Sequence, residues 1–511
     1  MTDNIKQEMI NKALWAACDT FRGTISADSY KDFILTMLFL KYISDVWQDH
    51  YEAYQTQYGD DSILIEEKMR AEQFALPREA NFYTLLEMRH EPDNGKRIDQ
   101  ALKILEEANS GMLKSAGKRV FQDISFNTDK LGEGKHKNLI LRHLLEDFAS
   151  PQLNLKPSRV GALDVIGNAY EYLIRNFAAS AGQKAGEFYT PPEVSDLLAE
   201  LLDPQPGDDI CDPTAGSASL LLKCGQKIFA NHKSNKYRLY GQEAISSTWS
   251  LAKMNMFLHG QDNHQIEWGD TIRNPKLLDP HGNLLQFDVV TANPPFSLDK
   301  WGYEEAAHDE FMRFERGLPP KTKGDYAFIL HMMSTLKPDT GRMGVVVPLG
   351  VLFRGSNEAI IRKRLIEENL LDAVIGLPEK LFYGSGIAAA ILIFKKKKTN
   401  TNVIFIDASR EYKAGKNQNL LSKENIDKIL EAYKNAADMD KYSHIATLEE
   451  IQKNDYNLNL PRYVDSLEKK EEGDFLAIYY EREKLKTQLI ELDNDIESYL
   501  VKLGYTTQSR I

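Results

Sequence analysis

The sequence is poor in cysteine and has no long apolar run. Its 511 residues include three cysteines, and their scattered positions, Cys18, Cys211 and Cys224, form neither a metal-binding spacing nor an even disulfide framework. No apolar run reaches the roughly 18 residues that a membrane-spanning helix needs. The start, MTDNIKQEMI, lacks the apolar core of a signal peptide. These absences predict a protein of the reducing cytoplasm that has no membrane partner.

Several well-known catalytic patterns are also missing. The sequence has no three-glycine dinucleotide fingerprint, which argues against hydride transfer on NAD. It contains no nucleophile elbow and no histidine cluster for a metal. The basic, glycine-rich segment 132–137 has no serine or threonine after Lys135, so we interpret it as a solvated loop and not as a phosphate-binding loop.

The sequence also has fewer basic than acidic residues. The formal net charge is -12 at pH 7. Because affinity for phosphates comes from lysine and arginine, this chain is not expected to coat nucleic acid by itself. A local basic surface or a basic partner must supply that attraction.

Between Asp208 and Asp407, short apolar runs alternate with helical patterns. The runs are Ile210–Cys211, Arg238–Tyr240, Ile266–Trp268, Phe287–Ala292, Met343–Val347, Leu371–Ile375, Ala389–Phe394 and Val403–Ile406. Residues 248–258 and 326–336 have the spacing of helices. This alternation predicts a mostly parallel sheet covered on both faces, whose ligands bind at the carboxyl ends of the strands.

Polar residues follow three of these predicted strands. Asp212 begins a turn in which Gly216 allows close approach of the backbone, and the N–H groups of the helix that follows suit an anion. Glu243 is able to accept hydrogen bonds from both hydroxyls of a ribose, and Asp270 from an adenine amino group. Each acid alone is more often a loop or cap residue. Their shared place at strand ends favours a ligand site.

Another predicted strand ends in Asn293-Pro294-Pro295-Phe296. Pro294 forces Asn293 into an extended conformation, and neither proline has an N–H to donate. The Asn293 side-chain oxygen and the Pro294 carbonyl therefore suit the two N–H groups of a planar exocyclic amine, while Phe296 stacks on its ring. The tetrapeptide by itself also fits a proline-stiffened turn with a core phenylalanine.

Residues 186–194 precede the alternating region and predict the start of a helix. Thr190 is suited to cap this helix, with Pro191 at the first position and Glu193 as its capping-box partner. The cap explains Thr190 without a ligand. Helix starts are nevertheless where anionic ligands dock, so a site here is also consistent with the sequence.

These motifs, in this order, resemble those of amino-group DNA methyltransferases. They are Phe188–Pro191, Asp212–Ser217, Glu243, Asp270 and Asn293–Phe296. Together with the helical start, they make nearly the whole chain similar to the modification (M) subunit of type I restriction-modification systems. One departure is Ser217-Ala218-Ser219, where relatives often have more glycine.

The resemblance implies a role for each motif. S-adenosyl-L-methionine is expected at Glu187, Phe188, Tyr189, Thr190, Pro191, Pro192, Asp212, Thr214, Ala215, Gly216, Glu243 and Asp270. Asn293, Pro294, Pro295 and Phe296 are expected to hold a flipped adenine for N6 methylation. The implied activity is site-specific adenine methylation of double-stranded DNA, which protects host DNA from restriction. The implied partners are a specificity (S) subunit that chooses the sequence, a restriction (R) subunit and a second M subunit.

The two ends of the chain predict helices. An apolar helix runs from Phe33 to Trp47, and helical spacing at 101–105 follows a predicted turn, Asp93-Asn94-Gly95-Lys96. Near the other end an apolar seam repeats at steps of four and three, formed by Leu485, Leu489, Leu492, Ile496, Tyr499 and Leu503. Such a seam either docks on its own chain or binds a partner helix. The resemblance favours an intersubunit bundle with the specificity subunit.

We therefore expect an α/β fold with a doubly wound, mostly parallel methyltransferase sheet. Residues 1–160 form an N-terminal helical domain, 161–410 the S-adenosylmethionine-dependent methyltransferase domain, and 411–511 a C-terminal helical tail for subunit assembly. Methyl transfer to an RNA base or to a protein glutamine amide suits the same loop. A catalytically silent scaffold for a DNA-bound complex is the alternative of a different class.

Overall fold

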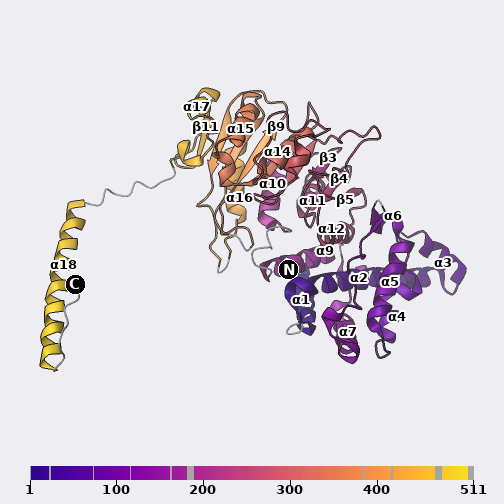
Figure 1. Cartoon of the computed structure of the whole chain (residues 1–511). Coiled ribbons are helices and arrows are strands. Elements are labelled where there is room, and N and C mark those ends of the chain that lie inside the picture. Colours follow the sequence, from indigo (N-terminus) through magenta and orange to yellow (C-terminus); the bar gives the residue numbers. More distant parts are fainter. Residues whose placement is uncertain are drawn as a thin grey trace. The chain divides into compact units, whose positions relative to one another are not determined.

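The computed structural model describes residues 2–21, 25–72, 74–115, 117–161, 164–180, 189–383, 386–415, 418–465 and 475–503. The chain divides into two compact units, Met1–Val464 and Asp465–Ile511 (Figure 1). None of the described helices combines the length and the apolar character that crossing a membrane requires.

The first unit begins with a helical region. Its helices are α1 (Thr2–Ala17), α2 (Ala27–Tyr58), α3 (Ser62–Arg70), α4 (Phe82–Glu87), α5 (Asn94–Ala108), α6 (Ser110–Leu113), α7 (Gly134–Phe148), α8 (Pro157–Val160) and α9 (Asp164–Ser180). A small antiparallel pair, β1 (Lys114–Ser115) and β2 (Lys118–Arg119), follows α6. The apolar run from Phe33 to Val46 is buried along α2, as its spacing predicts.

The turn predicted before residue 101 is wrong. Asn94 and Gly95 form the first turn of α5, and Asp93 precedes the helix in the left-handed conformation at φ 65°. Gly95 is needed for packing and not for a turn, because a Cβ atom there would lie 2.6 Å from a backbone carbonyl oxygen of residue 126. The close approach of two backbones explains a glycine that is otherwise typical of turns.

A nine-stranded sheet follows, with strand order β11-β10-β8-β9-β7-β6-β3-β4-β5. Its strands are β3 (Asp209–Asp212), β4 (Arg238–Glu243), β5 (His264–Trp268), β6 (Val289–Ala292), β7 (Arg342–Pro348), β8 (Leu371–Gly376), β9 (Ala389–Lys395), β10 (Val403–Asp407) and β11 (Ser443–Ala446). β9 pairs antiparallel with β7 and β8, and β11 pairs antiparallel with β10. The other neighbours pair in parallel, so the expected mostly parallel sheet is confirmed.

Helices cover both faces of this sheet. They are α10 (Pro192–Leu202), α11 (Ser219–His232), α12 (Ser246–Leu258), α13 (Tyr303–Ala306), α14 (Asp325–Ser334), α15 (Asn357–Glu367), α16 (Lys423–Asn435) and α17 (Leu448–Lys453). Side chains alternate along the strands, so that Val346 belongs to one buried cluster and its neighbours Val345 and Val347 to another. The first cluster includes α10, α11 and α12, and the second includes α14 and α15.

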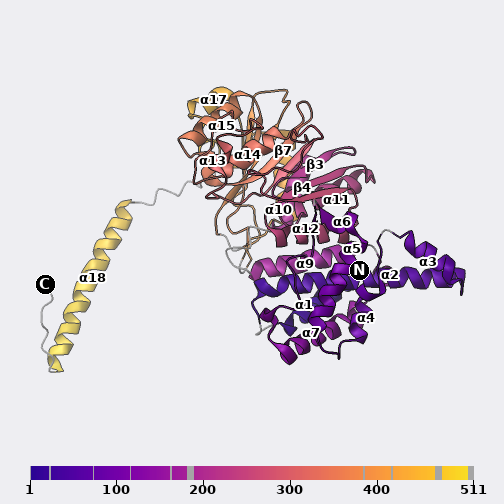
Figure 2. The same cartoon turned by 45° about the vertical axis from the view of Figure 1, so that its right-hand side comes forward.

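The N-terminal helices share the first cluster with one face of the sheet. α9 packs against α1, α2 and α12, and α12 packs in turn against β4 and β5. Figure 2 shows α9 and α12 between the N-terminal helices and the sheet. The helical region is thus continuous with the sheet core.

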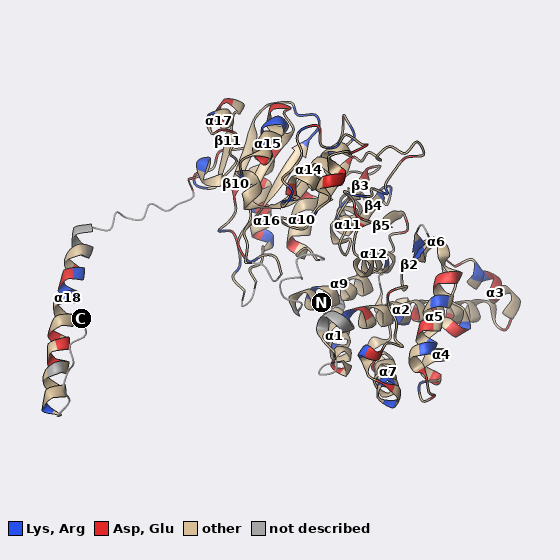
Figure 3. Ribbon diagram, in the orientation of Figure 1, with Lys and Arg blue, Asp and Glu red and all other residues tan. Residues whose placement is uncertain are grey.

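The described part of the second unit is a single helix, α18 (Phe475–Lys502). Basic and acidic residues both occur along it (Figure 3). Within this unit the residues of the predicted apolar seam are uncovered, with exposed fractions from 50% at Ile496 to 72% at Leu503.

Candidate functional site

Four neighbouring parallel strands end at one edge of the sheet. β6, β3, β4 and β5 lie side by side in this order. Asp212 ends β3 and Glu243 ends β4, while Asp270 comes two residues after the end of β5 and Asn293 directly after β6. The predicted polar residues therefore come to the edge at which open α/β sheets bind ligands.

The turn between β3 and α11 is tied to the end of β4. The Asp212 carboxylate accepts a hydrogen bond from the Thr214 N–H at 2.9 Å. Glu243 accepts from the Gly216 N–H at 2.9 Å and, through its other oxygen, from the Ile245 N–H at 2.8 Å. Gly216 has φ 53°, in the left-handed region that glycine enters without strain. Glu243 thus holds the turn, and each carboxylate oxygen keeps a second lone pair for a ligand.

Both acids are buried, and burial changes their protonation. Loss of solvent raises the pKa of Asp212 to about 7, helped by the nearby Glu243 carboxylate and opposed by the Thr214 hydrogen bonds. Burial also raises the pKa of Glu243, against the lowering effect of the backbone N–H groups that it accepts. A cationic ligand would favour the ionised form of both carboxyl groups.

A narrow pocket opens beside this turn. It is lined by Tyr189, Thr190, Asp212, Thr214, Ala215, Gly216, Ser217, Ser219, Leu220 and Asn293. The structure therefore brings together residues from three predicted motifs, and the Ser217 hydroxyl oxygen there is buried without a protein partner. Ala218 adopts φ 64° at the start of α11, so this turn reaches the left-handed region without the further glycine that is common in relatives. The expected ligands Glu187 and Phe188 lie outside the described residues.

Asn293 is held by Thr190. The Asn293 side-chain NH₂ donates to the Thr190 hydroxyl oxygen at 3.1 Å. The cap predicted for Thr190 is wrong, because α10 starts at Pro192, after Pro191, and no side chain caps it. Pro191 and Pro192 have no N–H, so the first backbone N–H groups of this helix belong to Glu193 and Val194. The hydroxyl is therefore free to accept from Asn293.

Phe296 lies against an aromatic residue that the sequence analysis missed. Its ring centre is 5.9 Å from that of Phe382, in an edge-to-face arrangement. The next residue, Tyr383, contacts Tyr189 with ring centres 5.7 Å apart. Both missed residues follow the end of β8. They lie six and seven residues beyond that end, so a rule that selects polar residues at strand ends does not find them.

A buried ion network anchors the chain just beyond Phe296. The Asp325 carboxylate accepts the Ser297 N–H at 2.8 Å and pairs with Arg354 at 2.9 Å. Arg354 also pairs with Glu358 at 2.8 Å. Burial raises the pKa of Glu358 to about 7, against the lowering effect of Arg354. The network is formed by residues that are distant in sequence, and no local pattern indicated it.

Asp270 stabilises the loop that begins with it. Its carboxylate accepts the backbone N–H groups of Ile272 and Arg273 at 2.8 and 2.9 Å, and it pairs with the Arg273 side chain at 2.8 Å. Asp270 does not line the narrow pocket. Its contact with an adenine therefore stays a prediction.

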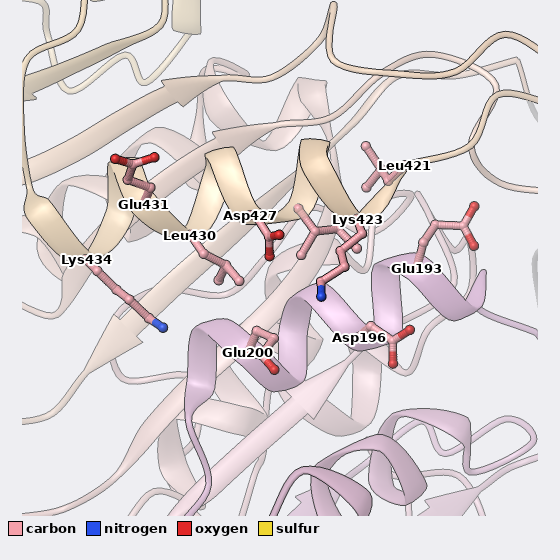
Figure 4. A pocket seen from close by; sticks show the side chains of 10 residues that line it. Glu193, Asp196, Glu200, Leu421, Lys423, Asp427, Leu430, Glu431 and Lys434 are labelled. Carbon is pink, nitrogen blue, oxygen red and sulfur yellow. The ribbon is translucent and has the colours of Figure 1, made fainter. Parts of the chain in front are cut away.

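A larger groove of about 680 Å³ lies between α10 and α16 (Figure 4). It contains none of the predicted site residues. Two of its acids, Asp196 and Glu200, are paired with Lys223 and Lys227 of α11. We therefore interpret these charged residues as ones that stabilise the packing of helices and not as ligand-binding residues. Among the described residues, no cluster of His, Cys, Asp and Glu could hold a metal ion.

Comparison with known proteins gives consistent matches over the chain. Residues 161–472 match the family model "N-6 DNA Methylase", and residues 10–148 match "HsdM N-terminal domain". The type I restriction enzyme MpnII methylase subunit of Mycoplasma pneumoniae is 29% identical, over 96% of both chains. The HindI methylase subunit of Haemophilus influenzae is 31% identical, over 80% of this chain and 93% of that protein.

A solved structure is similar as well. The type I restriction-modification system methyltransferase subunit from Streptococcus thermophilus has 35% sequence identity and a TM-score of 0.78. The match covers 90% of this chain and 100% of that one. The sheet and the helical regions described above are thus those of a known group of enzymes.

Proposed function

This chain belongs to the N-6 DNA methylase family, among the methylase subunits of type I restriction enzymes, and we propose that its narrow pocket is the S-adenosylmethionine site of an adenine N6 methyltransferase. The observation that carries this assignment is the meeting of Asp212, Gly216 and Asn293 in one pocket at the carboxyl edge of the sheet.

The chemistry of the residues present suits this cofactor, although the pocket has a volume of about 10 Å³ and must widen to admit it. The left-handed Gly216 exposes backbone at the pocket, and the Ser217 hydroxyl is buried there without a protein partner. Asp212 and Glu243 offer carboxylate oxygens, which suit ribose hydroxyls and a positively charged ligand. S-adenosylmethionine, when bound, supplies an activated methyl group whose bond to sulfur breaks as a bond to nitrogen forms.

Asn293 and Pro294 supply the other half of the site. The Asn293 side-chain oxygen is left for the substrate, because the NH₂ of the same amide is turned to Thr190. Together with the Pro294 carbonyl, it offers the two acceptors that the N–H groups of an adenine amine need. These oxygens localise the nitrogen lone pair and stabilise the positive charge that develops on nitrogen, until one of its protons leaves to solvent. The Phe296 ring packs edge-to-face with Phe382, and we infer that a flipped base stacks on the Phe296 ring.

The proposal includes the partners. DNA is the substrate, a specificity subunit selects the sequence, and a restriction subunit and a second M subunit complete the assembly in the cytoplasm. The apolar seam of α18 supports this, because its period is that of helices that pair with one another. We assign residues 1–160 to a helical domain, 161–410 to catalysis and 411–511 to assembly. The contribution of β11 to the sheet means that residues up to Val464 also support the catalytic core.

The test is a product assay with a matched pair of variants. The chain is incubated with S-adenosylmethionine and unmethylated DNA, alone and with its specificity subunit, and N6-methyladenine is measured by mass spectrometry. Asn293→Ala should abolish the product while calorimetry finds the cofactor affinity unchanged. Asn283→Ala, in a turn where the asparagine side chain bonds Asp279, should retain activity.

The alternatives give different results in the same assay. Methylated RNA or methylated glutamine, with no methylated DNA, would move the assignment to another planar amine. A protein that binds no cofactor would be a scaffold. Unchanged methylation by the Asn293 variant would remove that residue from the mechanism.

A further inference from the structure

An arginine is buried between α13 and α14, in a connection where charged side chains are usually exposed. The Arg313 side chain is 3% exposed, and it pairs at 2.6 Å with the Asp309 carboxylate, which is 6% exposed. Its guanidinium lies over the rings of Phe311 and Phe314, 5.5 and 5.4 Å from their centres. A buried guanidinium is stable only when its N–H groups have partners, and the other partners of Arg313 lie outside its own loop.

Three of these partners accept hydrogen bonds from Arg313. Nη1 donates to the Thr271 carbonyl oxygen at 3.1 Å, and Nη2 donates to the Ile272 carbonyl oxygen at 2.8 Å. Nη1 also donates to Nδ1 of His331 at 3.1 Å. A guanidinium has no acceptor, so the direction of each bond is fixed. Burial lowers the pKa of His331 to about 3, and Arg313 adds to this effect, so the imidazole stays neutral and able to accept.

The two carbonyl groups belong to the loop that follows β5. We call residues 270–273 the β5 loop. The Asp270 carboxylate holds this loop from within, because it accepts the Ile272 N–H at 2.8 Å. Arg313 binds the carbonyl of the same residue. The position of the β5 loop thus depends on a side chain that lies 41 residues further along the sequence.

The β5 loop in turn contacts the turn between β3 and α11. The Thr271 hydroxyl donates to the Pro213 carbonyl oxygen at 2.6 Å, and this direction is fixed because a carbonyl only accepts. Thr271 is 5% exposed, so the bond is shielded from water. Pro213 lies between Asp212 and Thr214, which both line the narrow pocket. A continuous chain of hydrogen bonds therefore leads from Arg313 through Thr271 to the wall of the pocket.

We propose that Arg313 is a positioning residue that fixes the β5 loop, and through Thr271 the turn at Pro213, in the geometry that binds S-adenosylmethionine. The inference rests on the proposed function and deepens it, because it adds residues that do not line the pocket. A site loses affinity when its walls are free to move, since binding must then also order them. Loss of the Arg313 contacts should therefore weaken cofactor affinity more than it lowers the rate at saturating cofactor.

The first experiment measures the S-adenosylmethionine Kd of Arg313→Lys by isothermal calorimetry, and its kcat in the complex with the specificity subunit. Lysine keeps a positive charge beside Asp309 but lacks the planar fork that reaches two carbonyl groups. We expect the Kd to rise about tenfold. The kcat at saturating cofactor should change less than about twofold.

Arg342→Lys is the matched control. Arg342 also binds two successive carbonyl groups, those of Leu202 and Asp203 at 2.6 and 2.9 Å, and it pairs with Asp208 at 2.8 Å. It begins β7, which runs parallel to β6, so it lies at the edge of the sheet opposite to the pocket. The same substitution there should leave the Kd unchanged.

The second experiment is a double-mutant cycle with Thr271→Val, which keeps the shape of the side chain and removes the hydroxyl. Alone it should raise the Kd about fivefold, the size of one hydrogen bond. In the Arg313→Lys background it should add less than about twofold, because the β5 loop is already displaced. Thr335→Val is its control, since this buried hydroxyl bonds the Met332 carbonyl. If circular dichroism shows that Arg313→Lys does not fold, the Kd of Thr271→Val decides the question.

Three results would overturn the inference. One is an unchanged Kd in folded Arg313→Lys or in Thr271→Val. Another is an equal rise in Kd in Arg313→Lys and Arg342→Lys, which indicates a general loss of stability. The third is additive effects in the cycle, which means that Arg313 does not act through Thr271. Failure of the proposed function is distinct, because the unaltered protein would then bind no S-adenosylmethionine.

Discussion

Asp212 should make cofactor binding depend on pH. Its pKa is raised to about 7 by burial, so it loses its proton in the neutral range and not near its usual 3.8. About one-tenth of this carboxyl is ionised at pH 6 and about nine-tenths at pH 8. If the positively charged cofactor binds the ionised form, its affinity rises about tenfold over this interval. The raised pKa of Glu243 acts in the same direction.

The assay is isothermal calorimetry with S-adenosylmethionine at a series of pH values, for the unaltered protein and for Asp212→Asn. The variant is neutral at every pH, and the difference between the two profiles removes any titration of the cofactor itself. We expect the variant to bind more weakly at pH 8 and to lose about one decade of pH dependence. Parallel profiles, with the variant shown to be folded by circular dichroism, would refute the role given to Asp212.

The raised pKa of Asp212 also affects the stability of the cofactor-free protein. A carboxyl group whose pKa is higher in the folded state stabilises the fold while it is protonated. The contribution of Asp212 is therefore fully present below 3.8 and is lost as the pH rises towards 7. Cofactor binding should offset this loss, so the stabilisation by ligand is expected to grow with pH.

Two further predictions concern buried charges. Asp325→Asn keeps an oxygen for the Ser297 N–H but removes the charge that pairs with Arg354. We expect kcat to fall about fivefold, with the cofactor affinity unchanged in calorimetry. An unchanged kcat would mean that the loop holds its place without this pair. Asp45→Ala leaves the buried Lys41 ammonium with the Leu153 carbonyl but without its anion, which should lower the free energy of unfolding by about 3–5 kcal/mol in urea denaturation. A loss below about 1 kcal/mol would contradict the importance of this pair.

The strands of the site could be predicted because their signals are local. Apolar runs such as Phe287–Ala292 end at polar residues, and parallel strands bring such ends to one edge. The antiparallel place of β9 between β7 and β8 has no local signal, since strand order is decided by the packing of the whole sheet. β11 was missed because Ser443–Ala446 is short and contains polar residues.

The contacts between motifs could not be predicted in the same way. The local sequence pattern suggested a helix cap at Thr190, and only the fold shows that its hydroxyl meets Asn293. Asp325, Arg354 and Glu358 are ordinary charged residues in the sequence. Their strong interactions depend on their burial and on the short distances between them in the folded chain. Side-chain pairs of this kind depend on tertiary structure, which no motif of a few residues encodes.

If the loop after β6 binds the target base as proposed, it distinguishes bases by a single ring substituent. Pro294 and Pro295 have no N–H, and the Asn293 NH₂ is directed to Thr190, so these residues meet a base with oxygen atoms. Hypoxanthine, which forms when adenine is deaminated, carries a carbonyl in place of the amine. It would bring a third oxygen against the two acceptors and leave all of them unpaired. The proposed site would therefore reject a deaminated base at the binding step, in addition to that base having no amine to methylate.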